Sequence, residues 1–97
     1  MPIAIKGRAI TAARELLRLT QHDLAASCQI SPATLSKIEG ELVTPYATTI
    51  RKIAKELTAR GIEFTNGTGV GVRMDYKKAA EYEAKTKEAG THDKVGP

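Results

Sequence analysis

Aromatic residues and cysteine are scarce in this chain. Its 97 residues include no tryptophan, one phenylalanine and one cysteine, although 41% of them are apolar. The hydrophobic core must therefore be built from leucine, isoleucine, valine and alanine. The single cysteine, Cys28, excludes an intramolecular disulfide and fits a reducing compartment. We expect Cys28 to be a small buried side chain, with redox sensing as the alternative.

Long apolar runs and metal-ligand clusters are also missing. No run approaches the roughly 18 apolar residues that a membrane helix needs, and the first ten residues lack the apolar segment of a secretory signal. His22 and His92 have no partners at the spacing of a metal site. The glycine-rich stretch 67–72 lacks the lysine and hydroxyl residue of a phosphate-binding loop. We therefore expect a cytoplasmic protein that needs no membrane and no cofactor and is not an enzyme.

The charge is unevenly distributed along the chain. The formal net charge is +4, and all of the positive excess lies in residues 1–60, because residues 61–97 contain as many acidic as basic side chains. A basic excess confined to one segment favours a polyanionic partner.

Helical signals dominate residues 1–60. Apolar residues recur three or four apart in residues 8–18. Thr20 with Asp23 approximates a capping box, and Ser31 followed by Pro32 is the clearest helix start in the chain. The predicted helices cover residues 8–18, 21–28, 32–39 and 47–60, with Gly40 and Gly61 ending the last two.

The pattern changes after Gly61. Apolar and polar residues alternate in residues 62–64 and 70–74, and the Asn66-Gly67 pair between them is a hairpin signal. Residues 76–97 are rich in charge and nearly lack an apolar stripe, which predicts either a solvated helix or a disordered tail.

The segment 20–40 suggests a DNA-reading element, because it combines two short helices with a tight turn. The residues that carry a family resemblance are Leu19, Gln21, Leu24, Ala25, Ile30, Ser31, Thr34, Leu35, Ile38, Glu39, Pro45, Ile50, Ile53, Ala54 and Leu57. Through them, residues 8–60 resemble the helix-turn-helix family of phage lambda repressor and Cro. That family usually has glycine where this chain has Gln29, and a left-handed glutamine there costs about 1 kcal/mol.

The resemblance implies a sequence-specific regulator of double-stranded DNA and assigns roles to individual residues. The positions that match base-contacting residues are Pro32, Ala33, Ser36 and Lys37. The positions that match phosphate-contacting residues, or that lie where the family approaches the DNA backbone, are Gln21, Ser31, Thr34, Arg8 and Arg51. Arg14 and Glu39 match a structural ion pair between the first helix and the recognition helix.

We therefore expect a mainly α fold in three parts. A four-helix, lambda-repressor-like DNA-binding domain covers residues 1–60, a short β-hairpin residues 61–75, and a polar, helical or disordered tail residues 76–97. Lys37 is the one long polar side chain on the reading face, so a single copy would read few base pairs. A homodimer on an inverted repeat, or the shape of the DNA, would supply the remaining specificity.

The hairpin is our candidate dimerisation element, because a lone two-stranded hairpin is marginal in water. In the alternative, it packs on the fourth helix of its own subunit. The apolar side chains concerned are Ile62, Phe64, Val70, Val72 and Met74.

Three functions fit these observations. The first is a repressor, bacterial or from a mobile element, that binds DNA near its own promoter. The second is the antitoxin of a toxin–antitoxin pair, which binds DNA in the same way and a toxin through residues 61–97. The third is a helical module that contacts only proteins.

Overall fold

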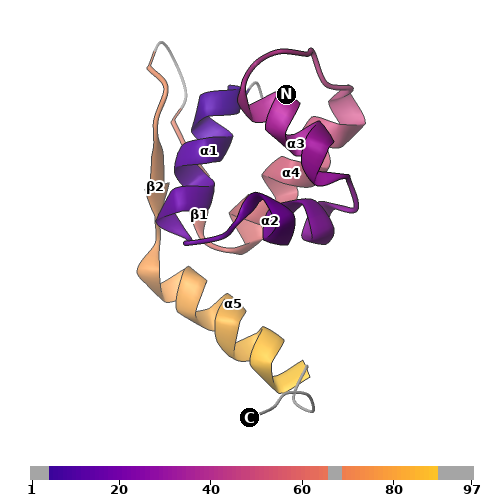
Figure 1. Ribbon diagram of the computed structural model, residues 1–97. Coiled ribbons are helices and arrows are strands. Elements are labelled where there is room, and N and C mark those ends of the chain that lie inside the picture. The colour runs from indigo at the N-terminus through magenta and orange to yellow at the C-terminus, as the bar shows by residue number, and fades with distance from the viewer. Residues whose placement is uncertain (1–4, 66–68, 90–97) are drawn as a thin grey trace.

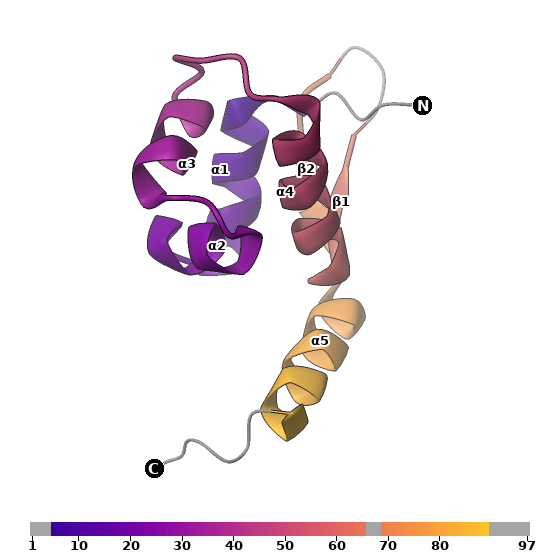
Figure 2. The same cartoon turned by 90° about the vertical axis from the view of Figure 1, so that its right-hand side faces the viewer.

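The computed structural model describes residues 5–65 and 69–89, the last three of these by their backbone alone. The fold of this part of the chain is mainly α, as predicted. Helices α1 to α4 surround a core, the hairpin covers α1 and α4 on the side away from α3, and α5 projects from one end (Figures 1 and 2). The elements in chain order are α1 (Gly7–Leu16), α2 (Gln21–Cys28), α3 (Pro32–Glu39), α4 (Ala47–Ala59), β1 (Ile62–Phe64), β2 (Val72–Met74) and α5 (Tyr76–Ala89).

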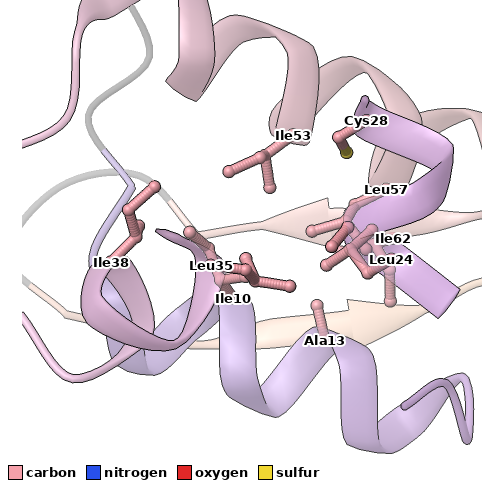
Figure 3. Close-up of a cluster of buried hydrophobic side chains, with 10 residues drawn as sticks. Ile10, Ala13, Leu24, Cys28, Leu35, Ile38, Ile53, Leu57 and Ile62 are labelled. Atoms are coloured by element: carbon pink, nitrogen blue, oxygen red, sulfur yellow. The ribbon is translucent and has the colours of Figure 1, made fainter. Parts of the chain in front are cut away.

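One aliphatic cluster holds the helices and the hairpin together (Figure 3). Burying each large member of such a cluster is worth about 1.5–3 kcal/mol. Leu16, the last residue of α1, is exposed. The largest fully buried side chains are Ile10, Leu24, Leu35, Ile53, Leu57 and Ile62.

The two short helices α2 and α3 begin with side-chain caps. The Thr20 hydroxyl accepts a hydrogen bond from the Asp23 amide, and the Asp23 carboxylate accepts one from the Thr20 amide, each 3.0 Å long. At α3, the Ser31 hydroxyl accepts a hydrogen bond from the Thr34 amide at 3.0 Å. Pro32 occupies the first helical position, where an amide hydrogen is not required. The predicted capping box and Ser-Pro helix start are confirmed.

Three helices are followed by a non-glycine residue with a left-handed backbone. Arg18, Gln29 and Glu41 have φ angles of 57°, 60° and 59°. The left-handed backbone expected at Gln29 is observed, and a non-glycine residue in this conformation costs about 1 kcal/mol. The prediction for the end of α3 needs a correction: Gly40 does follow the helix, but its φ is −79°, and the left-handed residue is Glu41.

The predicted hairpin is present but shorter than its sequence pattern. Strands β1 and β2 are antiparallel, with Ile62 opposite Met74 and Phe64 opposite Val72. Val70, which the alternation assigns to the second strand, lies before β2 and is exposed. The expected Asn66-Gly67 turn lies outside the described residues.

The hairpin belongs to the core of its own subunit. Strand β1 packs on α4 and β2 on α1, and Ile62 is a fully buried member of the core. The side chains of Phe64, Val72 and Met74 pack against the same cluster. The fold already supplies apolar neighbours for these residues, and their pairing across a dimer axis stays a prediction. The alternative, packing on the hairpin's own subunit, is observed.

Helix α5 is anchored at its beginning. The Asp75 carboxylate accepts a hydrogen bond from the Lys78 amide at 3.0 Å, and the Asp75 amide donates to the Gly61 carbonyl at 2.8 Å. One turn further, the Tyr82 hydroxyl donates to Glu56 at 2.9 Å, and the Arg60 guanidinium lies 4.6 Å from the centre of the Tyr82 ring. Of the two expectations for the tail, helix or disorder, the structure shows a helix over 76–89.

The caps of α2 and α5 make the stability sensitive to acid. The Thr20 amide lowers the pKa of Asp23, and the Lys78 amide lowers the pKa of Asp75, both from 3.8. Because these pKa values are lower in the folded chain, the stabilisation is complete above the unfolded pKa and is lost as the pH falls through the folded pKa. We expect the free energy of unfolding, measured by urea titration, to decrease below about pH 4. Asp23→Asn should make this decrease shallower, and a constant free energy in acid would contradict the prediction.

Candidate DNA-binding interface

Helix α3 presents one polar face to solvent and buries the other. Leu35, Ile38 and Glu39 point inward, against α1 and α2. The positions expected to contact bases lie on the exposed side of α3, and α3 lies across α1 from the hairpin (Figure 2). These exposed residues are Pro32, Ala33, Ser36 and Lys37.

This face carries few side chains that can contact the edges of DNA bases. A lysine at this position can donate to the O6 and N7 acceptors of guanine, and the alanine methyl suits the methyl group of thymine. Ser31 and Thr34, the expected phosphate-side positions, are exposed at the start of α3. Their hydroxyls are hydrogen-bonded to each other at 2.9 Å, which holds them beside the positive end of the helix dipole.

A buried carboxylate joins α3 to the two preceding helices. The Oε1 atom of Glu39 accepts hydrogen bonds from Thr11 Oγ1 at 3.0 Å, Gln21 Nε2 at 3.0 Å and Arg14 Nη2 at 3.1 Å. Its Oε2 atom accepts a bond from Arg14 Nε at 3.0 Å. The expected Arg14–Glu39 ion pair is thus part of a larger network, in which both oxygens of the carboxylate are satisfied.

The same network holds the beginning of α2. The Arg14 Nη1 atom donates to the Leu19 carbonyl at 2.9 Å, just before the cap residue Thr20. Gln21, the first residue of α2, is expected to contact a phosphate, and one hydrogen of its amide group is already donated to Glu39. Its second amide hydrogen is left for an anion at the helix N-terminus.

Arg8 and Arg51, the further phosphate candidates, differ in their surroundings. The Arg8 side chain donates to Glu41 through Nε at 3.2 Å and Nη2 at 3.0 Å, and its backbone amide donates to the same carboxylate at 3.2 Å. This pairing lowers the pKa of Glu41. A phosphate would have to share the Arg8 guanidinium with Glu41. Arg51 lies on the exposed side of α4.

Two members of the site were not found from the sequence. Thr11 binds Glu39 across 28 positions of the chain, and Glu41 binds Arg8 across 33. No local motif marks either contact. For Thr11, the only signal is its place three residues before Arg14, which puts both on one side of α1.

Cys28 lies on the inner side of α2, away from the outer face of α3. It is buried beside the Lys52 carbonyl, and burial raises the pKa of its thiol. A raised pKa disfavours the reactive thiolate, so the environment is that of a small core residue rather than of a redox sensor.

The fold and this site define a class of protein. A capped helix pair, a solvent-facing second helix and supporting helices on the other side form the helix-turn-helix arrangement of DNA-binding domains. In the residues that the structure describes, no helix is long and apolar enough to cross a membrane.

A family comparison names the class more closely. A helix-turn-helix family model matches residues 10–59, which is more than half of the chain, and the chain belongs to this family of lambda-repressor and Cro-like regulators. The family binds double-stranded DNA and is regulatory rather than enzymatic. A search of curated protein sequences gave no significant match.

Proposed function

We propose that this protein is a transcriptional repressor that binds an inverted DNA repeat as a dimer. The observation that carries the proposal is the outer face of α3, where Ala33, Ser36 and Lys37 are exposed together while the opposite side is locked into the core. In this proposal Lys37 reads a guanine, Ala33 contacts a thymine methyl, and Gln21 anchors a phosphate.

The sparse reading face supports the dimer. With one long donor side chain, a single α3 distinguishes few base pairs, whereas two copies double the number of positions that are read. Each matched position contributes about 1–3 kcal/mol of discrimination. Repression follows if the site overlaps a promoter, because the bound protein then excludes polymerase.

The role of Lys37 can be tested on a DNA site obtained by selection. Selection from a randomised duplex library with the full-length protein would supply a preferred sequence. Lys37→Ala should weaken binding to that sequence by about 10- to 100-fold and leave binding to random DNA nearly unchanged. Its effect on the salt dependence should be small, because Lys37 is assigned to a base and not to a phosphate.

Lys77→Ala is the matched control, since Lys77 is an exposed lysine on α5. This variant should retain the wild-type preference. If Lys37→Ala weakened binding to preferred and random DNA equally, Lys37 would be a phosphate contact. If selection recovered no preferred sequence at all, the proposed function would fail.

The antitoxin function stays as a second candidate because of α5. This helix projects from the body of the domain (Figure 1), and Tyr76 at its start is exposed. A toxin bound through residues 61–97 would protect α5 from hydrogen exchange, and it would co-purify with the full-length chain but not with a chain ending at residue 75.

A further inference from the structure

A polar cluster outside the reading face joins α2 to α4 and α5. The Arg60 guanidinium donates through Nη2 to Ser27 Oγ at 3.0 Å and through Nε to Glu56 Oε2 at 2.7 Å. It also lies 4.6 Å from the centre of the Tyr82 ring, and the Tyr82 hydroxyl donates to the same Glu56 oxygen at 2.9 Å. Burial and the bond to Glu56 raise the pKa of Tyr82, so its hydroxyl stays a donor at neutral pH. We refer to these four residues as the Arg60 cluster.

The Arg60 cluster holds the end of α2 that leads into the turn before α3. Ser27 is the last residue but one of α2, and the left-handed Gln29 follows two residues later. Among the described residues, the Ser27–Arg60 bond is the one hydrogen bond between side chains that connects α2 to α4 or to a later element. The other end of α2 is held by the bond from Gln21 to Glu39. These two points lie about 9 Å apart along the helix, so α2 can pivot about one of them if the other is released.

Helix α5 fixes the geometry of the Arg60 cluster. The side chains of Arg60 and Glu56 form an i,i+4 ion pair and are only 18% and 20% exposed. A solvent-exposed pair of this spacing is weak and holds its geometry poorly. The docked Tyr82 adds its ring to the guanidinium and its hydroxyl to the carboxylate, which confines Arg60 to the orientation that reaches Ser27.

The attachment of α5 to the rest of the fold is local. Its start is held by Asp75 and by a close approach to Gly61, where a Cβ atom would lie 2.9 Å from the Ala79 amide nitrogen. Tyr82 makes the contacts of the Arg60 cluster, and residues 83–86 beyond it are all exposed. A helix that buries so few side chains can detach without unfolding the remaining core. Helix α5 is therefore a two-state element, docked or detached.

We propose that the docking of α5 controls DNA binding: docked α5 holds the end of α2 through Tyr82 and Arg60, and detached α5 releases it. The inference rests on the proposed function and names a regulation of it. Release of Ser27 lets α2 and the turn before α3 move, so these parts have to be ordered when DNA binds, which costs affinity. A partner that takes the Tyr82 side of α5 would compete with docking and would therefore weaken DNA binding.

A double-mutant cycle tests the connection, with the affinity of the full-length protein for the selected duplex as its readout. Ser27→Ala and Tyr82→Ala should each weaken binding about 3- to 10-fold. The double variant should bind no more weakly than the weaker single variant, because both changes break the same connection. Both variants should fold, since Ser27 is exposed and alanine favours the helix at position 82.

Tyr76→Ala is the matched control, because Tyr76 is an exposed tyrosine of the same helix. It should bind like the wild type, and a loss equal to that of Tyr82→Ala would overturn the proposal, because α5 would then act outside the Arg60 cluster. Wild-type affinity in Tyr82→Ala would overturn it as well. So would losses that multiply in the double variant, since Ser27 and Tyr82 would then act independently.

Failure of the proposed function would be recognisable separately, by hydrogen exchange in the free protein. The Gln29 and Ile30 amides are bonded to carbonyls at the end of α2, so their exchange measures the opening of this end. Tyr82→Ala should accelerate their exchange about 3- to 10-fold and leave that of Leu24, in the first turn of α2, unchanged. This result without any preferred duplex would support the connection and reject only the proposed function. Unchanged exchange at Gln29 and Ile30, or equal acceleration at Leu24, would overturn the connection itself.

Discussion

Gly7→Ala should lower the melting temperature by roughly 12–24 °C, corresponding to a loss of about 3 kcal/mol. A Cβ atom at Gly7 would lie 2.8 Å from the Glu39 carbonyl oxygen and closer still to the Ile38 carbonyl oxygen. Both are backbone atoms at the end of α3, so neither can move aside as a flexible side chain would. Thermal unfolding followed by circular dichroism measures the effect.

The sign of the stability change in Gly7→Ala distinguishes backbone crowding from helix propensity. Gly7 lies in the first turn of α1, where alanine would stabilise a free helix by about 0.5–1 kcal/mol. Gly69→Ala is the control, because a Cβ atom there would have no neighbour within 4 Å, and its effect should stay within about 0.5 kcal/mol. A Gly7→Ala protein as stable as the wild type would show that α1 and α3 do not approach each other this closely.

Glu39→Ala should destabilise the fold by about 3–5 kcal/mol, because it leaves the Arg14 guanidinium nearly buried without its counter-charge. The hydrogen bonds from Thr11 and Gln21 are lost at the same time. Urea unfolding at neutral pH gives the free energy. Against a typical total of about 5–15 kcal/mol, such a loss can unfold much of the protein.

The double variant Arg14→Met/Glu39→Leu separates the cost of the unpaired charge from the cost of lost packing. If the main cost in Glu39→Ala is the uncompensated guanidinium, removing both charges should restore part of the stability. The double variant should therefore be more stable than Glu39→Ala. A cost below about 1 kcal/mol for Glu39→Ala would mean that water replaces the carboxylate and that the network contributes little.

The helices are predictable where their signals are local. The Thr20–Asp23 box and the Ser31-Pro32 start are formed by residues within one turn of each other, so their order in the chain is enough to find them. The end of α1 is not predictable in the same way. The sequence pattern places it at Arg18, whereas it lies at Leu16, because a left-handed arginine carries no sequence signal.

In the candidate site, too, local features are predictable from the sequence and contacts between distant residues are not. Helical periodicity places Ala33, Ser36 and Lys37 on one side of α3, whatever the rest of the molecule does. The roles of Thr11 and Glu41 depend on contacts between distant parts of the chain, and no spacing rule predicts them. The alternation in the hairpin likewise shows that one face is buried but not which surface buries it.

The placement of Ile62 in the core also bears on how the chain folds during synthesis. Strand β2 packs on α1, which lies more than 50 residues earlier in the chain, so the last layer of the core is closed by a long-range contact. Such contacts form late and slowly. While the ribosome is still translating the hairpin, α1 to α4 would have an open apolar side. The helices that carry the DNA-reading residues would then reach their final packing only after residue 74 has left the exit tunnel.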